Sequence, residues 1–167
     1  MNEKLKKLYK KLEQMRLYDH ATGVIGFDFE TAVPKKAMEA EGDLISYFSN
    51  QYFKIIKSKS YEQLVIDLYK ELDTLDYLDQ ILVKRLYESY QKSKNITPKM
   101  DLAFSKIYNK AYIDWLEAKE KKDYKLFIPS FKKVIETEKK QIELRDEKLD
   151  DLYDNMLNEC EKGVLQK

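Results

Sequence analysis

The sequence predicts an all-α fold, a bundle of several helices. Across almost the whole chain, apolar residues recur at spacings of three and four, the period of one face of an α-helix. No stretch shows the strict alternation of apolar and polar residues that marks a strand, and no Asn-Gly or Asp-Gly pair marks a hairpin turn. With 4 Gly and 3 Pro in 167 residues, the helices are expected to be joined by connections of only a few residues.

The first predicted helix has an amphipathic pattern. Its apolar face is formed by Leu5, Leu8, Leu12 and Met15. The pattern changes after Arg16, because Ala21–Phe29 is small, apolar and contains Gly23 and Gly26. Both a packed helix and a buried turn fit this segment, and its glycines predict the close approach of another backbone.

Three more helices are expected before residue 95. The second runs from about Lys35 to Lys57 and directs into the core Met38, Leu44, Ile45, Phe48, Tyr52 and Ile55. Ser60 and Gln63 form a capping box for the third, whose apolar stripe is Leu64, Leu68 and Leu72. The fourth spans about Tyr77–Lys92, with a core face of Leu78, Ile81, Leu82, Leu86 and Tyr90.

The carboxyl-terminal half predicts two long helices. Thr97 followed by Pro98 is a strong helix start, because the hydroxyl caps free N–H groups and proline has no N–H to leave unpaired. This fifth helix fades near Lys122 and carries Phe104, Ile107, Tyr108, Ala111 and Trp115. Asp123 is expected to cap the next segment, and a sixth helix follows over about Ile128–Arg145. Together these elements predict a single helical domain over residues 1–167.

Composition argues against several classes of function. The formal net charge is +1, so no global field favours nucleic acid, and no nucleic-acid-binding motif is present. The lysines of the first helix are interpreted as a solvated face. No apolar run approaches the ~20 residues of a membrane span, and the charged amino terminus lacks the apolar core of a signal peptide. The one cysteine, Cys160, fits a reducing compartment. We therefore expect a soluble, cytoplasmic protein with no nucleic-acid or membrane partner.

A single histidine, His20, limits the metal chemistry that the chain can perform. An H-E-x-x-H zinc site needs two histidines one helical turn apart, so this sequence cannot contain one. With Asp19, Asp28 and Glu30 nearby, His20 could form a small metal or acid–base cluster. An ordinary helical histidine and capping or paired carboxylates are the favoured interpretation.

Two further residues invite a functional interpretation. Cys160 would need a base to act as a nucleophile, and the chain offers no motif for one, so a structural or incidental thiol is favoured. Trp115 could belong to an aromatic ligand cage with Phe104, Tyr108 and Tyr112. At helical spacing such a stripe more often packs in a core.

Short motifs follow one another along the chain. They are GVIGFDFETAVPK (23–35), EAEGDLISYFS (39–49), YIDWLEAK (112–119), DYKLFIP (123–129) and YDNMLNECEKG (153–163). The first resembles the G-W-D-x-E-T-x-x-P-K segment of the carboxypeptidase Taq family of zinc metallocarboxypeptidases, with Phe27 in place of the usual Trp. The last resembles that family's Y-D-x-L-L-x-x-Y-E-x-G, with Cys160 where an aromatic residue is usual. Each motif alone is weak, but four or more in this order are fairly specific.

The resemblance implies that this chain is the amino-terminal portion of a longer peptidase. Such enzymes have a mostly helical, neurolysin-like fold around a long substrate groove, and they remove single residues from the carboxyl ends of peptides as homodimers. The zinc-binding H-E-x-x-H helix and a third Glu ligand would lie beyond Lys167. Zinc or another divalent metal is therefore expected in the intact enzyme, while this chain alone is predicted to hold no metal and no catalytic residue and to be inactive. Oligoendopeptidase F and thimet-type oligopeptidases share the architecture and are the second match.

Two functions follow from this interpretation. In the first, the chain is the lid and groove wall of the peptidase, with Asp28, Glu30 and Thr31 as candidates that line the groove. Its partners would be the missing catalytic part, which would leave an apolar surface exposed, and the peptide substrate. In the second, the chain is a non-enzymatic helical interaction or scaffold module whose apolar face binds a partner helix or a second copy. An open reading frame that continues into an H-E-x-x-H segment would distinguish them.

Overall fold

The structure, a computed structural model, describes residues 2–163. Within that range the chain forms helices and no strand, so the all-α prediction is confirmed. The helices are α1 (Glu3–Thr31), α2 (Met38–Ile56), α3 (Lys59–Lys70), α4 (Tyr77–Ser93), α5 (Pro98–Lys121), α6 (Ile128–Glu143) and α7 (Leu152–Cys160). Short 3₁₀ segments precede α2, α4 and α6, namely η1 (Lys35–Ala37), η2 (Leu72–Thr74) and η3 (Tyr124–Leu126). Searched over the same residues, none of these helices combines the length and the hydropathy that a membrane span requires.

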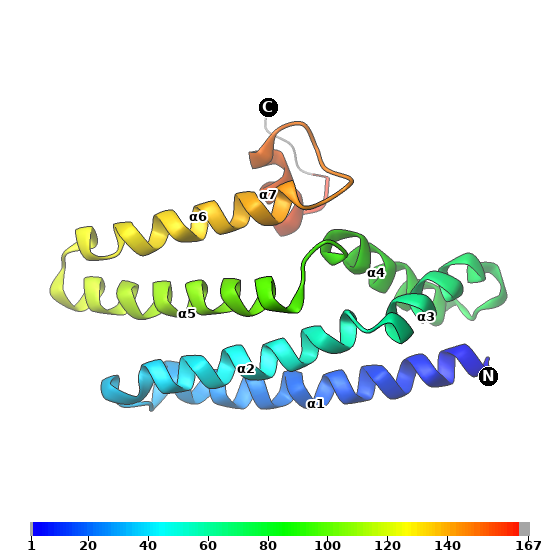
Figure 1. Cartoon of the computed structure of the whole chain (residues 1–167), viewed down its shortest axis with the longest axis horizontal. Coiled ribbons are helices and arrows are strands. Elements are labelled where there is room, and N and C mark those ends of the chain that lie inside the picture. The colour runs from blue at the N-terminus through cyan, green and yellow to red at the C-terminus, as the bar shows by residue number, and fades with distance from the viewer. Residues whose placement is uncertain (1, 164–167) are drawn as a thin grey trace.

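Helix α2 is at the centre of the packing. Figure 1 shows α1, α2, α5 and α6 stacked in this order, with α2 in contact with both α1 and α5. Helices α3 and α4 pair with each other near the amino terminus, where α3 also packs on α1. The chain then turns back after α6, so that α7 packs against it. Within residues 2–163, α1 packs mainly on α2 and α3.

Helix α1 is continuous over 29 residues. It begins after Asn2, whose side-chain oxygen accepts a hydrogen bond from the N–H of Lys4 at 2.8 Å. Of the two alternatives for Ala21–Phe29, the helix is the one observed. The predicted close approach of a backbone is wrong, because outside the helix's own turns no atom lies within 4 Å of where a Cβ would stand on Gly23 or Gly26.

The tightest apolar core joins the amino-terminal half of α1 to α3 and α4. Its buried members are Leu5, Leu8, Met15, Tyr61, Val65, Leu68, Leu75 and Val83. The stripe predicted for α3 is right at Leu68, but Tyr61 and Val65 share the buried face rather than Leu64. Burial raises the pKa of the Tyr61 hydroxyl to about 12. The apolar face predicted for α1 is confirmed, since Leu5, Leu8 and Met15 all lie in this core.

The cap of α3 lies two residues earlier than predicted. Ser58 is the N-cap, and its hydroxyl accepts a hydrogen bond from the N–H of Tyr61 at 3.3 Å. Ser60 is already inside the first turn and exposed, so the capping box with Gln63 is wrong. Ser58 and Ser60 offer the same hydroxyl, and the chain leaves the helical conformation at Ser58, where φ is −72° and ψ is 132°.

The interface between α2 and α5 is polar. Ser46 is fully buried, and Asn109 Nδ2 donates to its hydroxyl at 2.9 Å and to the carbonyl oxygen of Gly42 at 2.7 Å. The hydroxyl of Ser105 donates to the hydroxyl of Ser46 at 3.1 Å. These bonds satisfy side chains that would otherwise be costly to bury.

A second polar contact lies one turn beyond Ser46 along the same interface. The buried Asn50 donates through Nδ2 to the carbonyl oxygen of Pro98 at 2.6 Å and to Asp101 Oδ2 at 3.2 Å. Burial raises the pKa of the Asp101 carboxyl above its ordinary value, although the Asn50 bond acts in the opposite direction. The carboxylate is therefore held in a setting that favours its protonated form.

The predicted core face of α2 is partly wrong. Leu44 was expected to point inward, but 44% of it is exposed, while Gly42, Ser46 and Asn50 form the fully buried side together with Met38. Residues four apart lie on one side of a helix, and these small and polar residues let α5 approach. The helix is thus rotated so that this face, and not Leu44, meets its partner.

The buried face of helix α4 also differs from the predicted one. Leu78 is 76% exposed, whereas Val83 is completely buried. The physical reason is that α4 packs mainly on α3, so only one narrow side of it is covered. A sequence pattern of several apolar residues does not show how many neighbours a helix has.

The helix boundaries of the carboxyl-terminal half agree closely with prediction. The Thr97 hydroxyl accepts a hydrogen bond from the N–H of Met100 at 3.3 Å, so it caps α5 as expected. Helix α5 ends at Lys121 before a left-handed Lys122, and Asp123 caps η3 through the N–H of Lys125 at 3.0 Å. Helix α6 ends at Glu143, two residues before the predicted end.

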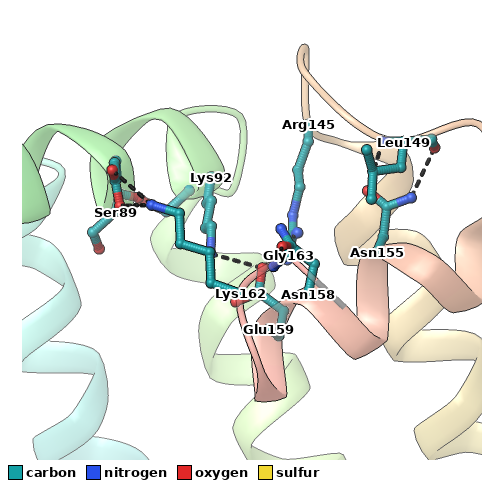
Figure 2. A network of polar contacts seen from close by, with 11 residues as sticks. Ser89, Lys92, Arg145, Leu149, Asn155, Asn158, Glu159, Lys162 and Gly163 are labelled. Atoms are coloured by element: carbon teal, nitrogen blue, oxygen red, sulfur yellow. Dashed lines mark hydrogen bonds and ion pairs between the residues drawn. The ribbon is translucent and has the colours of Figure 1, made fainter. Parts of the chain in front are cut away.

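Helix α7 is held in place by a polar network (Figure 2). Lys92 Nζ of α4 and Arg145 Nη1, just beyond α6, each lie 2.8 Å from Glu159 Oε1 of α7. Burial acts to raise the pKa of Glu159, but these two cations hold it below its ordinary value. Asn155, which is buried, accepts a hydrogen bond from the N–H of Leu149 at 2.9 Å and donates to the carbonyl oxygen of Leu149 at 2.8 Å. The network fixes both α7 and the loop before it.

We expect Asn109→Ala to lower the free energy of unfolding by about 1–3 kcal/mol, because it removes the donor that satisfies two oxygens at the α2–α5 interface. Lys106→Ala, on the same helix, is the matched control, since its 2.8 Å contact with Asp43 is exposed and such pairs contribute less than about 1 kcal/mol. Urea denaturation followed by circular dichroism measures both. An Asn109→Ala effect no larger than the control would contradict a structural role for this contact.

We expect Asp101→Asn to stabilise the protein at neutral pH. A pKa that is raised in the folded state means that this group stabilises the fold below its unfolded pKa and that this stabilisation is lost as pH rises through the folded pKa. Asparagine stays neutral, so the gain in melting temperature should shrink as pH falls from about 7 to about 4, since the raised pKa lets the native carboxyl take up its proton more readily than an ordinary aspartate.

Asp146→Asn is the control of opposite sign. The hydrogen bond from Lys94, followed by that from Asn95, lowers the pKa of Asp146, so this substitution should lower the melting temperature at neutral pH and matter less in acid. Thermal unfolding at both pH values tests the pair. If the gain in melting temperature of Asp101→Asn does not depend on pH, titration of the Asp101 carboxyl is not its cause.

Candidate functional site

The three groove-wall candidates lie in the last turn of α1. Asp28, Glu30 and Thr31 all have exposed side chains. The hydroxyl of Thr31, the final helical residue, donates back to the carbonyl oxygen of Phe27 at 2.6 Å. This bond orients the Thr31 methyl group and hydroxyl at the helix end.

The sequence fixes where this helix ends. The carbonyl oxygen of Asp28 accepts hydrogen bonds from the N–H groups of Ala32 and Val33 at 2.9 and 3.0 Å. Pro34 then stops the helix, because proline disfavours the helical conformation in the residue before it and is itself extended here, with φ −62° and ψ 142°. The chain turns through η1 into α2, which brings Lys35 close to the end of α1.

A hollow of about 590 Å³ lies between the end of α1, η1 and the carboxyl-terminal half of α5. Its lining consists of Phe29, Glu30, Thr31, Val33, Lys35, Met38, Ile113, Leu116, Glu117, Glu120 and Lys121. The structure therefore brings Glu30 and Thr31 together in one depression. Asp28 is not part of the lining, and it lies about 200° around the helix from Glu30, the residue two positions later.

The hollow has an apolar floor. Phe29 is 6% exposed and Met38 is 8% exposed, and the Phe29 ring lies 5.5 Å from the ring of Tyr112 in α5. Aromatic and aliphatic side chains from α1, α2 and α5 thus hold the floor together. Such a surface suits contact with another polypeptide segment.

The rim of the hollow is charged. Lys35 and Glu120 form an ion pair across it, and the hydrogen bond from Lys35 lowers the pKa of Glu120. Lys121 and Glu117 pair at 2.5 Å along α5. The carboxylate of Glu30 has no ion-pair or hydrogen-bond partner within residues 2–163, which leaves it available to a ligand or to another part of the protein.

The α5 side of the hollow was not identified from the sequence. Ile113, Leu116 and Glu117 lie within the YIDWLEAK motif, which supported the family resemblance without suggesting a role for individual residues. One local signal existed, the Glu117–Lys121 pair at a spacing of four. Nothing in the sequence showed that this face of α5 would meet the end of α1.

His20 is exposed on the surface of α1. Its distance from Asp28 along the helix axis is about 12 Å, since each residue rises about 1.5 Å. The possible cluster of His20, Asp19, Asp28 and Glu30 therefore does not assemble. Over residues 2–163 no group of three or more His, Cys, Asp or Glu side chains is arranged to hold a metal ion. The zinc site that the resemblance implies does not fit these residues.

The remaining candidates have ordinary settings. Cys160 is a free, exposed thiol at the last residue of α7. Phe104 is buried and Tyr112 packs on Phe29, as expected for a core stripe. Trp115 departs from that stripe: it is 40% exposed, and Lys119 Nζ lies 5.0 Å from its ring centre, which stabilises the cation over the aromatic face.

Comparison with known proteins places this fold among peptidases. Residues 7–167 match the family model described as carboxypeptidase Taq (M32) metallopeptidase. The chain is similar to carboxypeptidase 1 of Bacillus subtilis, with 28% identity over 97% of this chain and 32% of that protein. It is also similar to thermostable carboxypeptidase 1 of Pyrococcus furiosus, with 27% identity over 98% of this chain and 32% of that protein.

A solved structure shows the same helical arrangement. The crystal structure of a protein named BsuCP superimposes with a TM-score of 0.90 at 27% identity, over 98% of this chain and 33% of that one. The chain thus spans about a third of the length of the relatives that it matches. Because the family model covers nearly all of the sequence, the chain belongs to the carboxypeptidase Taq (M32) metallopeptidase family.

Proposed function

We propose that this chain is the amino-terminal lid and groove-wall portion of a zinc-dependent metallocarboxypeptidase that removes carboxyl-terminal residues from peptides. The single observation that carries the proposal is the superposition of 98% of the chain on one third of BsuCP, with a TM-score of 0.90. A segment that keeps the relatives' fold so closely is suited to the same position in a longer protein.

The hollow at the end of α1 supports the groove-wall role. Glu30 and Thr31 stand on its edge above an apolar floor, and the Glu30 carboxylate is unpaired within the described residues. A peptide main chain carries N–H groups that such a carboxylate and hydroxyl can bind. The zinc ion, or another divalent metal, would be held by the part of the enzyme that this sequence does not include, so the chain alone would not be catalytic.

Exposed apolar side chains support a partner. On α1, Val24 is 58% exposed and Phe27 is 71% exposed, and they lie on one side of the helix because their spacing is three. We assign this face to contact with the catalytic part of the enzyme; self-association through the same face is the alternative in its absence. The proposal keeps the cytoplasmic location that the single cysteine predicts.

The proposed function is tested by placing this chain in a related carboxypeptidase. We expect the protein of 167 residues alone to show no carboxypeptidase turnover with zinc added. A chimera in which residues 2–163 replace the matching third of Bacillus subtilis carboxypeptidase 1 should release carboxyl-terminal amino acids from peptides. The physical reason is that the shared fold should present the same surface to the catalytic part. Amino-acid release assayed with and without a chelator measures both proteins.

Two outcomes would overturn this proposal. Zinc-dependent turnover by the isolated chain would show that it holds its own active site. A chimera that folds by circular dichroism but has no activity would favour the scaffold or interaction module, since the fold would then be conserved without the groove function.

In an active chimera, we expect Asp28→Ala or Glu30→Ala to change kcat/KM by about tenfold, which corresponds to about 1.4 kcal/mol, with little change in melting temperature. Glu30 should have the larger effect, because it lines the hollow and Asp28 does not. Steady-state kinetics and thermal unfolding separate the two roles.

Glu136→Ala in α6 is the matched control, since it is also an exposed carboxylate on a helix and lies outside the hollow. This substitution should leave both kcat/KM and the melting temperature unchanged. If the Asp28 and Glu30 variants have a lower melting temperature but an unchanged kcat/KM, these residues have a structural role instead.

A further inference from the structure

A second depression lies at the other end of α1, between α1 and α3. It has a volume of about 510 Å³, and its lining includes Lys7, Lys10 and Lys11 from α1 and Ser60, Gln63 and Leu64 from α3. We call it the lysine groove. It is separate from the hollow at the end of α1, with which it shares no lining residue.

The two walls of the lysine groove run in opposite directions. Lys4, near the start of α1, contacts Glu71 just beyond the end of α3 at 2.5 Å. Two turns later, Lys11 Nζ lies 3.5 Å from the hydroxyl of Ser58, the residue that caps the start of α3. The groove therefore extends along both helices between these two contacts.

The lysines of the groove lack acidic partners. Within the described part of the chain, Lys7 and Lys10 have no ion pair, and Lys11 contacts only the neutral Ser58 hydroxyl. Other cations of the same helix are paired, as the contacts of Lys4 with Glu71, Lys6 with Glu3 and Arg16 with Glu13 show. The lysines of α1 without an acidic partner in the described part of the chain are thus the three that line the groove.

The opposite wall does not neutralise the groove. Its one carboxylate, Asp67, already accepts a hydrogen bond from Gln63 Nε2 at 2.7 Å and lies 3.9 Å from Lys4. The other groups that α3 presents are a hydroxyl, an amide and an aliphatic side chain. The lining as a whole keeps an excess of positive charge, which attracts a ligand with several negative groups.

We propose that the lysine groove binds an acidic segment of a peptide or protein, with its carboxylates on Lys7, Lys10 and Lys11. The distance from Lys7 to Gln14 along α1 is about 10 Å, which matches three or four residues of extended chain. Leu64 and the aliphatic stems of the lysines provide an apolar floor for such a chain. No aromatic side chain lines the groove, so it lacks the stacking surface by which proteins bind single-stranded nucleic acid.

This inference does not depend on the proposed peptidase function. It is tested by fluorescence anisotropy with dye-labelled hexaglutamate, and with hexaglutamine carrying the same dye. We expect the protein to bind hexaglutamate and not hexaglutamine at about 0.01 M salt, where charges act over about 30 Å, and to release it at about 1 M salt, where they act over about 3 Å.

The variant Lys7→Gln, Lys10→Gln, Lys11→Gln should raise the Kd for hexaglutamate about tenfold, because each exposed pair contributes a fraction of 1 kcal/mol. The control is Lys54→Gln, Lys84→Gln, Lys132→Gln, which removes the same charge from exposed positions on α2, α4 and α6. It should change the Kd by less than about twofold. Circular dichroism confirms that both variants keep the wild-type fold, as glutamine and lysine have similar helix propensities.

Three results would overturn the proposal. No binding of hexaglutamate at low salt would show that these lysines are merely solvated. An equal loss in the two triple variants would show non-specific attraction to the whole surface. Tighter binding of hexathymidylate than of hexaglutamate would assign the groove to nucleic acid rather than to an acidic peptide.

Discussion

The polar contact between α2 and α5 is the constraint on which the rest of the fold depends. Small residues of α2, Gly42 and Ser46, let α5 come close, and Asn109 fixes the register by bonding to both. Once α5 is placed, its carboxyl-terminal half can reach the end of α1 and form the hollow that holds Glu30. Apolar packing alone would permit several rotations of α2, whereas these bonds are satisfied in only one.

The helices from α1 to α6 could be predicted from the sequence, but α7 was not predicted, and the orientations of the helices could not be. Spacing of apolar residues and the Thr97–Pro98 cap located α5 almost to the residue, because both signals are local. The buried face of α2 was missed, since the rule that large apolar residues point inward ranks Leu44 above Ser46. A buried serine becomes favourable only when Asn109, 63 residues away, is placed beside it. That information is in the tertiary structure and not in any local window.

The candidate site was predictable to the same limited extent. The family resemblance selected the right segment of α1, and Glu30 and Thr31 do line a hollow, but the spacing that separates Asp28 from Glu30 is a property of the helix. The sequence left open whether this segment is a helix or a turn, so it could not be predicted which of its side chains share one side. The α5 wall lies within the YIDWLEAK motif, but the motif gives no role to single residues, because apolar side chains such as Ile113 and Leu116 resemble any others until their neighbours are known.

The order of helix contacts has a consequence for how this chain assembles. The pairs α1–α2, α3–α4 and α5–α6 are each consecutive in the chain, and α1–α3 and α2–α5 join them. Contacts between consecutive elements close short loops, which makes them quick to form and lowers the entropic barrier to assembly. Helical hairpins of this kind can open and close as separate cooperative units. Amide exchange should therefore reveal subglobal openings in which α5, α6 and α7 separate from the body together while α1 and α2 stay paired.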